Sequence, residues 1–526
     1  MIHIPRERRS AYLRTTRILS VISAISAIVY LRWLYVDARP DNVWLFAMLV
    51  AAETFNVVQA AGFWWTISNQ RWAELPVPDF NHTSETVDIY ITVCGEPTEI
   101  VERTILGALA IRHPRKSVYV LDDGRSHEIE VLAYVNGANY LTRRLNRGAK
   151  AGNINDAMER TNGGYIVIFD ADHVPRSDFL EKTMGGFADP MIAFVQTPQS
   201  YANRTENRVA WGAHEQQRLF YGPIMRGRRA FDAAFSCGTN MVFRRSALVA
   251  VGGMPEDSIT EDLRVSLLLL EKGYRSEYVS TVLAHGLGPL DVSGFFGQQL
   301  RWARGGLEIL FRRRPFRKGM HLGTRIQFAL SFLYWFTGFA YAVYLVLPVA
   351  FLVFGVRPVQ APNQYPLYFV PYIVVTLITM TYATDFDVTF RGVWFTLASF
   401  HVHIAAFFSA LLGADAKFVV TSKSGSSRSL RPVAYHLVII AVLAFSIVFG
   451  VLRFGFTPSV MNNVAFALGH ILILQGFVRY ARHPEVPAGE EGEGGTAESL
   501  AFEEPAVVTT AAEAGITINE WGGAEE

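Results

Sequence analysis

Cysteine is scarce in this chain of 526 residues, which contains only Cys94 and Cys237. Two cysteines exclude a disulfide framework and a zinc site built from several thiolates. Charge of one sign is not in excess either, because 48 basic side chains balance 47 acidic ones and leave a formal net charge of +1. The overall charge therefore indicates no particular partner, and we expect no binding to nucleic acid.

Signals for processing and for a folded C-terminal extension are also lacking. The first apolar run is long and has no convincing small-residue cleavage site after it, so we expect no cleavable signal peptide. Beyond Arg482 the sequence contains no Lys or Arg and is rich in Glu. This composition predicts a disordered acidic tail over residues 481–526.

Hydrophobic residues, by contrast, make up 50% of the chain. Six runs are long enough to span a bilayer, which needs about 20 apolar residues. They cover residues 18–36, 43–67, 327–355, 364–383, 433–453 and 460–479. A seventh run, 389–412, carries Arg391, His401 and His403 among aromatic residues. We interpret this run as an amphipathic helix in the membrane interface.

Positive charges predict the orientation of these runs, because Lys and Arg concentrate on the cytoplasmic side of a membrane. Arginines cluster before and at the start of the first run, and a basic loop extends from Lys423 to Arg431. Six spans put both basic segments and both termini in the cytoplasm, whereas a seventh span would put the basic loop outside. We therefore expect a multi-pass protein of the cell (inner) membrane.

The same reasoning divides the chain into four parts. Residues 1–79 would hold two spans, and residues 80–315 a cytoplasmic domain. Residues 316–480 would hold four spans with the interface helix and the basic loop, and residues 481–526 the tail. Polar residues inside the spans, such as Glu53 and Asn56, fit either hydrogen bonding between helices or a hydrophilic path.

The cytoplasmic region alternates strand and helix patterns. Apolar β-branched runs at Val87–Val93 and Ser117–Leu121 enclose a helical pattern at 98–111, and a further strand pattern begins at Tyr165. This alternation predicts a doubly wound parallel sheet.

The strand that begins at Tyr165 ends at Asp170 and Asp172. Open α/β sheets bind ligands at the carboxyl ends of their strands. Two carboxylates there form a hard oxygen site suited to Mg²⁺ or Mn²⁺, which would hold a diphosphate. An isolated Asp-x-Asp pattern is weak, and the strand context strengthens it.

Other short motifs have two interpretations each. Asp122-Asp123-Gly124 is an ordinary turn or a contact to a ribose or base. The segment 146–153 places small and basic residues at a helix start, which suits a phosphate without forming a Walker loop. Thr260-Glu261-Asp262 caps a helix or supplies acids. The segment from Gln298 to Gly305 carries Arg and Trp side chains that either anchor the chain at the membrane interface or, in the case of Arg, bind a phosphate.

Five motifs in order resemble those of processive family 2 glycosyltransferases of the cellulose synthase type. They are Asp122-Asp123-Gly124, Asp170-Ala171-Asp172, Thr260-Glu261-Asp262, Gln298-x-x-Arg301-Trp302 and Phe418-Val-Val-Thr421-Ser-Lys423, the last matching the gating-loop motif of the family. The resemblance covers roughly residues 80 to 430. It implies an α/β GT-A (Rossmann-like) cytoplasmic catalytic domain inserted in a transmembrane domain of about six spans plus interface helices.

The resemblance also implies a role for each motif. Residues expected to bind the donor nucleotide are Glu96, Asp123, Lys150, Asp170, Gln298, Arg301, Thr421 and Lys423, the last two closing over UDP. Residues expected to border the acceptor sugar are Cys237, Gly238, Thr239 and Trp302. Asp170 and Asp172 would bind Mg²⁺ or Mn²⁺, and Asp262, next to Glu261, would be the general base.

The activity implied is inverting, processive elongation of a β-linked polysaccharide from a UDP-sugar, with export through the spans. Cellulose from UDP-glucose is the first expectation, and mixed-linkage glucan, chitin or hyaluronan are alternatives. The expected partners are the donor, the growing polymer, membrane lipid and a periplasmic or extracellular accessory subunit. A non-processive transferase acting on a lipid carrier and a non-catalytic channel or scaffold are further alternatives.

Two features depart from that family. No cyclic di-GMP-binding PilZ pattern follows the last span, so we expect no such regulation within this sequence. Cys94-Gly95-Glu96 replaces the more usual Tyr-Asn-Glu at the predicted uridine contact.

Overall fold

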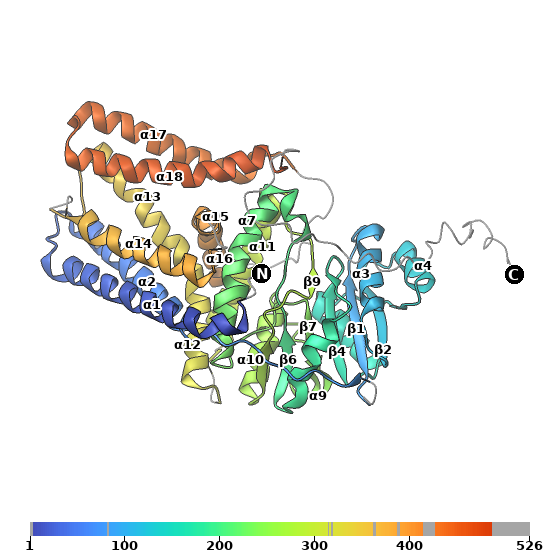
Figure 1. Ribbon diagram of the computed structural model, residues 1–526. Coiled ribbons are helices and arrows are strands. Elements are labelled where there is room, and N and C mark those ends of the chain that lie inside the picture. The colour runs from blue at the N-terminus through green and yellow to red at the C-terminus, as the bar shows by residue number, and fades with distance from the viewer. Residues whose placement is uncertain are drawn as a thin grey trace.

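A computed structural model describes residues 4–80, 84–313, 315–316, 319–360, 364–386, 390–413 and 427–486. It contains a mixed α/β domain beside a group of long apolar helices (Figure 1). The domain is built on a sheet of seven strands in the order β3-β2-β1-β4-β7-β6-β8. These strands are β1 Val87–Val93, β2 Lys116–Asp122, β3 Asn139–Leu141, β4 Tyr165–Asp170, β6 Ile192–Gln196, β7 Met241–Arg244 and β8 Arg275–Tyr278.

One strand runs against the others. β7 pairs antiparallel with both β4 and β6, whereas the other pairs in this sheet are parallel. The prediction of an all-parallel sheet is therefore wrong at β7. The reason lies just before this strand, where Asn240 N donates to Ile168 O at 2.9 Å near the end of β4. Because β7 starts at the carboxyl end of β4, it has to run in the opposite direction.

Helices cover both faces of the sheet because successive strand residues point to opposite sides. On one face, odd-numbered β1 residues such as Ile89 and Ile91 pack in one core with Val101 and Ile105 of α3. On the other face, Tyr90 packs in a second core that includes α5, α9 and α10. The helices of this domain are α3 Thr98–Ala110, α4 His127–Val135, α5 Ala149–Arg160, α6 Phe179–Thr183, α7 Arg208–Leu219, α8 Met225–Arg229, α9 Arg245–Ala250, α10 Glu261–Glu271 and α11 Val292–Arg312.

A small two-stranded sheet closes one side of the same domain. It pairs β5 Val174–Pro175 antiparallel with β9 Ala284–His285. This pairing brings the segment after Asp172 next to the segment that leads into α11.

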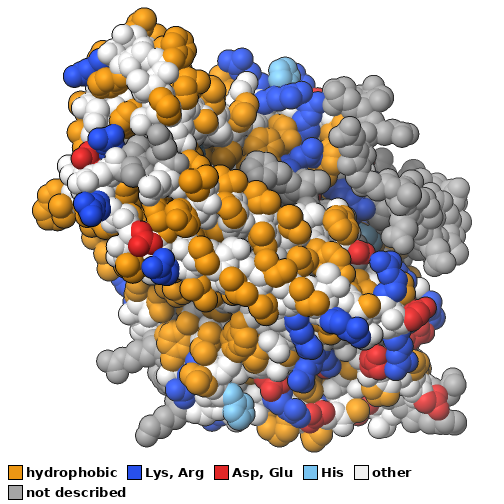
Figure 2. Space-filling view, turned by 60° about the vertical axis from the view of Figure 1, so that its left-hand side comes forward, with side chains coloured by type: hydrophobic (Ala, Val, Ile, Leu, Met, Phe, Trp, Pro, Cys, Tyr) orange, Lys and Arg blue, Asp and Glu red, His pale blue; other side chains and the backbone are white. Residues whose placement is uncertain are grey.

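Six helical segments in the described part of the chain are long and apolar enough to cross a membrane, as the sequence predicted. They comprise α1 Arg9–Arg32, α2 Val43–Ile67, α12 Leu322–Leu333 followed by α13 Thr337–Phe354, α14 Tyr365–Ala383, α17 Ala434–Phe454 and α18 Pro458–Arg482. Their apolar side chains form a broad hydrophobic surface (Figure 2). A contiguous apolar surface of this extent is unusual for a water-soluble protein, so the surface fits contact with lipid.

The predicted interface helix is two helices, α15 Phe390–Ala398 and α16 Phe400–Leu412, bent by 44°. Ala406 and Ala410 of α16 share a buried cluster with Ala303 and Leu307 of α11. Small residues let the two helices approach closely, so the membrane part is packed directly against the helix that carries Gln298 to Trp302.

Of the tail predicted over residues 481–526, the structure describes residues 481–486. α18 continues to Arg482, and the residues after it pair with the segment before α7. Arg208 N donates to Pro484 O at 2.7 Å, and Val486 N donates to Glu206 O at 3.0 Å. Residues 487–526 lie outside the described part of the chain.

Candidate active site

Asp170 and Asp172 lie at the carboxyl end of β4, where the sequence predicted a ligand site. The backbone N–H of Asp170 donates to Thr239 Oγ1 at 2.9 Å. Asp172 is buried, and its Oδ2 accepts from Leu287 N at 2.9 Å. The Asp170 side chain is 38% exposed, so it remains accessible to a ligand.

Lys150 reaches this acid pair from the start of α5. Its ammonium contacts Asp170 Oδ1 and donates to Gly238 O at 2.6 Å. Burial lowers the pKa of Lys150, but the carboxylates of Asp170 and Glu261 outweigh burial and raise the pKa above its ordinary value. Burial likewise raises the pKa of Asp170, and the Lys150 ammonium brings it below the ordinary value. Lys150 is therefore a fixed positive charge at the predicted diphosphate position.

Asp262 and Glu261 begin α10, on the other side of the same space. The Oδ1 of Asp262 accepts from Leu263 N at 2.7 Å. Burial raises the pKa of both carboxyl groups, which also repel one another. Thr260 precedes the helix without capping it through its side chain, so the capping interpretation is wrong for this threonine.

The segment Cys237–Thr239 joins the two acidic sites. Gly238 has φ +85°, and a Cβ atom there would lie 3.2 Å from Asp262 Oδ2. The Gly238 carbonyl oxygen accepts a hydrogen bond from the Lys150 ammonium, and the Oγ1 of the adjacent Thr239 accepts one from the Asp170 backbone N–H. Cys237 N donates to Gln196 Oε1 at 2.8 Å, a buried support that the sequence did not indicate. Lys150, Asp170 and Asp262 thus meet around one short loop.

Helix α11 supplies the third side of the site. Its Gln298 Nε2 donates to Tyr201 Oη at 3.5 Å, and Trp302 is half-buried. The positive charge of Arg301 is close enough to lower the pKa of Asp262 against the larger effect of burial. Gly305 allows this approach, since a Cβ atom there would lie 2.3 Å from Thr260 Cγ2.

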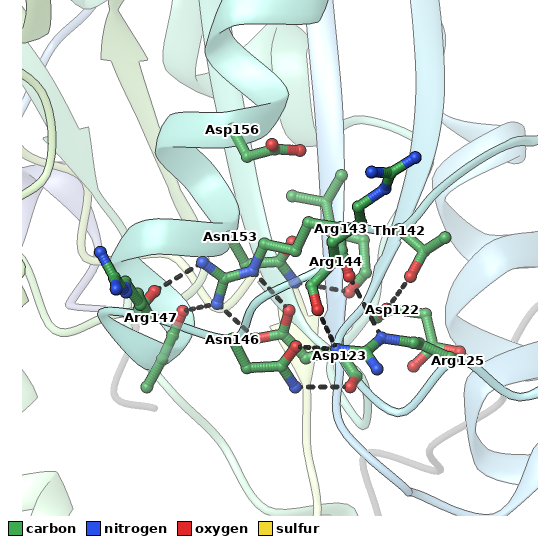
Figure 3. Close-up of polar contacts among 12 residues, drawn as sticks. Asp122, Asp123, Arg125, Thr142, Arg143, Arg144, Asn146, Arg147, Asn153 and Asp156 are labelled. Carbon is green, nitrogen blue, oxygen red and sulfur yellow. Dashed lines mark hydrogen bonds and ion pairs between the residues drawn. The ribbon is translucent and has the colours of Figure 1, made fainter.

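Glu96 and Asp123 are the residues predicted to contact the uridine of the donor. Glu96 Oε2 accepts from Cys94 N at 2.6 Å, and burial raises its pKa, with Asp170 and Asp172 adding to the effect. Asp123 forms a two-pronged ion pair with Arg143, in which Nε donates to Oδ1 and Nη2 to Oδ2, each at 2.7 Å (Figure 3). Arg143 was not predicted. The uridine contacts of Glu96 and Asp123 stay predictions.

A cavity of about 470 Å³ opens beside Lys150 and Glu261. Arg304, Glu308 and Arg312 of α11 line one side of it, and Ser409, Ala410 and Gly413 at the end of α16 line another. Thr421 and Lys423, the predicted lid residues, lie outside the described residues. At the far end of that segment, Ser427 N donates to Asp291 Oδ2 at 3.0 Å, at the start of α11.

The residues present fit a hard divalent cation. No cluster of three or more His, Cys, Asp and Glu side chains suited to a metal occurs in the described ranges. Asp170 and Asp172 nevertheless supply two carboxylates, a donor set that Mg²⁺ and Mn²⁺ accept when diphosphate and water oxygens complete the coordination. Lys150 and Thr92 both donate to Asp170 Oδ1, rather than to its Oδ2.

Comparison with known proteins defines the class. The family model "Glycosyl transferase family group 2" matches residues 165–384, which contain β4, α10 and α11. Residues 165–384 are therefore similar to family 2 glycosyltransferases, and they include β4, β6, β7 and β8 of the mixed sheet. A mannosyltransferase from Pyrobaculum calidifontis, solved with GDP-Man and Mn²⁺, superposes with a TM-score of 0.49 and 18% identity, covering 70% of this chain and 100% of that chain.

Sequence comparison adds similarity to bacterial cellulose synthases. The cellulose synthase 1 catalytic subunit (UDP-forming) of Komagataeibacter xylinus is 34% identical over 380 residues, which cover 70% of this chain and 51% of that protein. The cellulose synthase catalytic subunit (UDP-forming) of Pseudomonas fluorescens (strain SBW25) is 33% identical over 381 residues, covering 69% of this chain and 51% of that protein. The chain is thus related to bacterial cellulose synthase catalytic subunits over most of its length, and it spans about half the length of these relatives.

Proposed function

We propose that this chain is a membrane-bound, processive, inverting glycosyltransferase that elongates a β-linked polysaccharide from a UDP-sugar. The observation that carries the proposal is the meeting of Lys150, Asp170 and Asp262 around the Gly238 loop. It combines a cation and an acid pair for a diphosphate with a separate, half-buried carboxylate for a proton. The similarity to UDP-forming cellulose synthase catalytic subunits supports UDP-glucose as donor and a β-1,4-glucan as product.

Asp262 is the group that would take the proton from the acceptor hydroxyl. A hydroxyl is a weak nucleophile, and a carboxylate within hydrogen-bond reach removes its proton as attack proceeds. One base on one side of the donor gives a single displacement, so the linkage formed has the opposite configuration to the α-linked donor. Cys237 to Thr239 and Trp302 would hold the terminal sugar of the acceptor in line.

The leaving diphosphate needs its developing negative charge neutralised. Lys150 supplies one fixed positive charge, and Arg301 with Gln298 would supply further donors. Asp170 and Asp172 would hold Mg²⁺ or Mn²⁺, which when bound acts as a Lewis acid on the diphosphate oxygens. Glu96 and Asp123 would contact uridine, and Thr421 and Lys423 would close over it.

The remaining assignments belong to the same proposal. The catalytic domain at 80–315 would face the cytoplasm, with the basic termini and loop on the same side of the inner membrane. The spans in 1–79 and 316–480 would export the polymer. A partner on the outer side would receive it.

The proposal is tested by offering the purified protein UDP-glucose, UDP-N-acetylglucosamine and UDP-glucuronate with Mg²⁺, followed by digestion of the product with linkage-specific glycosidases. Polymer from UDP-glucose that a β-1,4-glucanase degrades supports the proposal. Polymer made from another donor would show that the proposed donor sugar is wrong. UDP release without polymer would contradict processive transfer. No turnover of any donor would favour a non-catalytic scaffold.

A further inference from the structure

Two adjacent arginines have opposite environments after β3. Arg144 is exposed, whereas Arg143 is 8% exposed and lies at the carboxyl end of β2. A buried guanidinium is costly unless its charge and its N–H groups are paired. Arg143 meets that requirement with the two-pronged Asp123 pair and with two backbone carbonyl oxygens (Figure 3).

The two carbonyl groups belong to the turn that starts α5. Arg143 Nη1 donates to Arg147 O at 2.5 Å, and Nη2 donates to Ala149 O at 2.7 Å. Between them, Gly148 has φ +68° and Ala149 has φ +45°. A residue with a Cβ atom is strained in this left-handed region, so Ala149 needs support from outside the turn. Arg143 supplies that support.

The next residue is Lys150. Its ammonium contacts Asp170 and Gly238 O, so the course of the turn decides where this charge lies. Gly148, Ala149 and Lys150 line the cavity beside Glu261, and Arg143 is not among the described residues that line it. Arg143 therefore contacts the turn on the side away from the cavity, and Lys150 lies on the side that lines the cavity.

We infer that Arg143 is a positioning residue for donor binding. Held by Asp123, its guanidinium fixes the left-handed turn at Gly148 and Ala149, and the turn aims the Lys150 ammonium at the diphosphate of the donor. This inference rests on the proposed function. It gives Asp123 a second task, because the Asp123 carboxylate orients the guanidinium fork that grips the turn.

The matched substitutions are Arg143→Gln and, as control, Arg144→Gln, which removes the same charge from an exposed neighbour. Arg143→Lys is the second variant, because it keeps the charge and the fold but cannot reach the carboxylate and both carbonyl groups at once. The measurements use the full chain in detergent; the lysine acylation is done with a chelator present, and the UDP titrations are done with Mg²⁺.

The first measurement is acylation of lysines by an amine-reactive ester, followed by mass spectrometry. Lys150 should react about tenfold faster in both Arg143 variants, as expected for loss of one charge-assisted hydrogen bond that restrains it. Lys116, which is held by the carbonyl groups of Leu109 and Ile111, is the internal reference and should not change. A rise at both lysines, or at neither, would overturn the inference, and this readout does not depend on UDP.

The second measurement is the Kd of UDP in two backgrounds. Arg143→Lys should weaken UDP binding about tenfold in the natural chain and less than about twofold when Lys150 is already Met, because residues that act through one another are not additive. Equal weakening in both backgrounds would mean direct contact of Arg143 with the nucleotide and would overturn the inference. If the natural chain itself binds no UDP, the proposed function fails, and acylation of Lys150 still decides the role of Arg143.

Discussion

Gly305 of α11 lies directly against Thr260, the residue that precedes α10. A Cβ atom at position 305 would lie 2.3 Å from Thr260 Cγ2 and 2.5 Å from its Oγ1. The helix that carries Gln298, Arg301 and Trp302 can therefore approach the first turn of α10, where Asp262 lies. This contact sets the distance between Asp262, the proposed base, and Trp302, which is proposed to stack on the acceptor sugar.

Gly305→Ala should therefore impair catalysis more than folding. The added methyl group displaces the first turn of α10, and a misplacement of about 1 Å can cost about 100-fold in rate. We expect polymer formation to fall at least about tenfold while the Kd of UDP stays within about twofold. Gly297→Ala on the same helix is the control, since nothing lies within 4 Å of a Cβ atom there. Equal activity of the two variants would contradict the role of the contact.

Asp262→Asn should abolish polymer formation, because an amide cannot accept the proton of the acceptor hydroxyl. UDP binding should persist, since the amide keeps the size of the side chain. Asp156→Asn removes a partly exposed acid that pairs with Arg160 on α5 and serves as the control. Polymer synthesis by Asp262→Asn at close to the natural rate would exclude this residue as the base.

The pH dependence of kcat/KM should follow the same carboxylate. Burial raises the pKa of Asp262 above its ordinary value, and the base acts only when it is deprotonated. Activity should be complete above the raised pKa and should fall as the pH drops through it, so the acidic limb lies above the ordinary aspartate range of about 3.9. Tryptophan fluorescence at each pH checks that the protein stays folded. Full activity down to about pH 4 would contradict this environment for Asp262.

Trp302→Ala should reduce engagement of the acceptor. The ring offers a flat apolar face to a sugar, so its loss should lower kcat/KM for elongation and shorten the products. Trp302→Phe retains a flat ring and should recover part of the activity. Products of natural length from Trp302→Ala, sized by chromatography, would count against stacking.

Removal of divalent cations should stop transfer, and Mg²⁺ or Mn²⁺ should restore it. Asp172→Asn removes one of the two charged oxygens proposed to hold the cation and should raise the concentration needed for half-maximal activity about tenfold or more. Titration of activity with each metal measures this. A chelator-resistant rate, or an unchanged titration in Asp172→Asn, would show that the acid pair does not bind the cation.

The strands that bear the site were predictable because β1, β2 and β4 are rich in apolar and β-branched residues and end at polar turns. The direction of β7 was not predictable, since it depends on the long-range contact of Asn240 with the end of β4. Arg143 was missed for a related reason. Two adjacent arginines have the same local signal, and only the tertiary structure buries Arg143 and exposes Arg144.

The pairing of Pro484 and Val486 with the segment before α7 shows the same limit. Composition alone predicts disorder for the C-terminal region, because it is rich in Glu and has no Lys or Arg beyond Arg482. Backbone hydrogen bonds to a distant segment are independent of side-chain composition. The six apolar spans, in contrast, follow from run length alone, and the described part of the chain contains six helical segments long enough to cross a membrane.

The most direct test of the account is the product made from UDP-glucose by the natural chain reconstituted in proteoliposomes, compared with Asp262→Asn. We predict that the natural chain releases UDP together with a polymer that β-glucanase degrades and α-glucanase does not, and that Asp262→Asn makes none. An α-linked product, or UDP release without polymer, would contradict processive inverting transfer at the Lys150, Asp170 and Asp262 site.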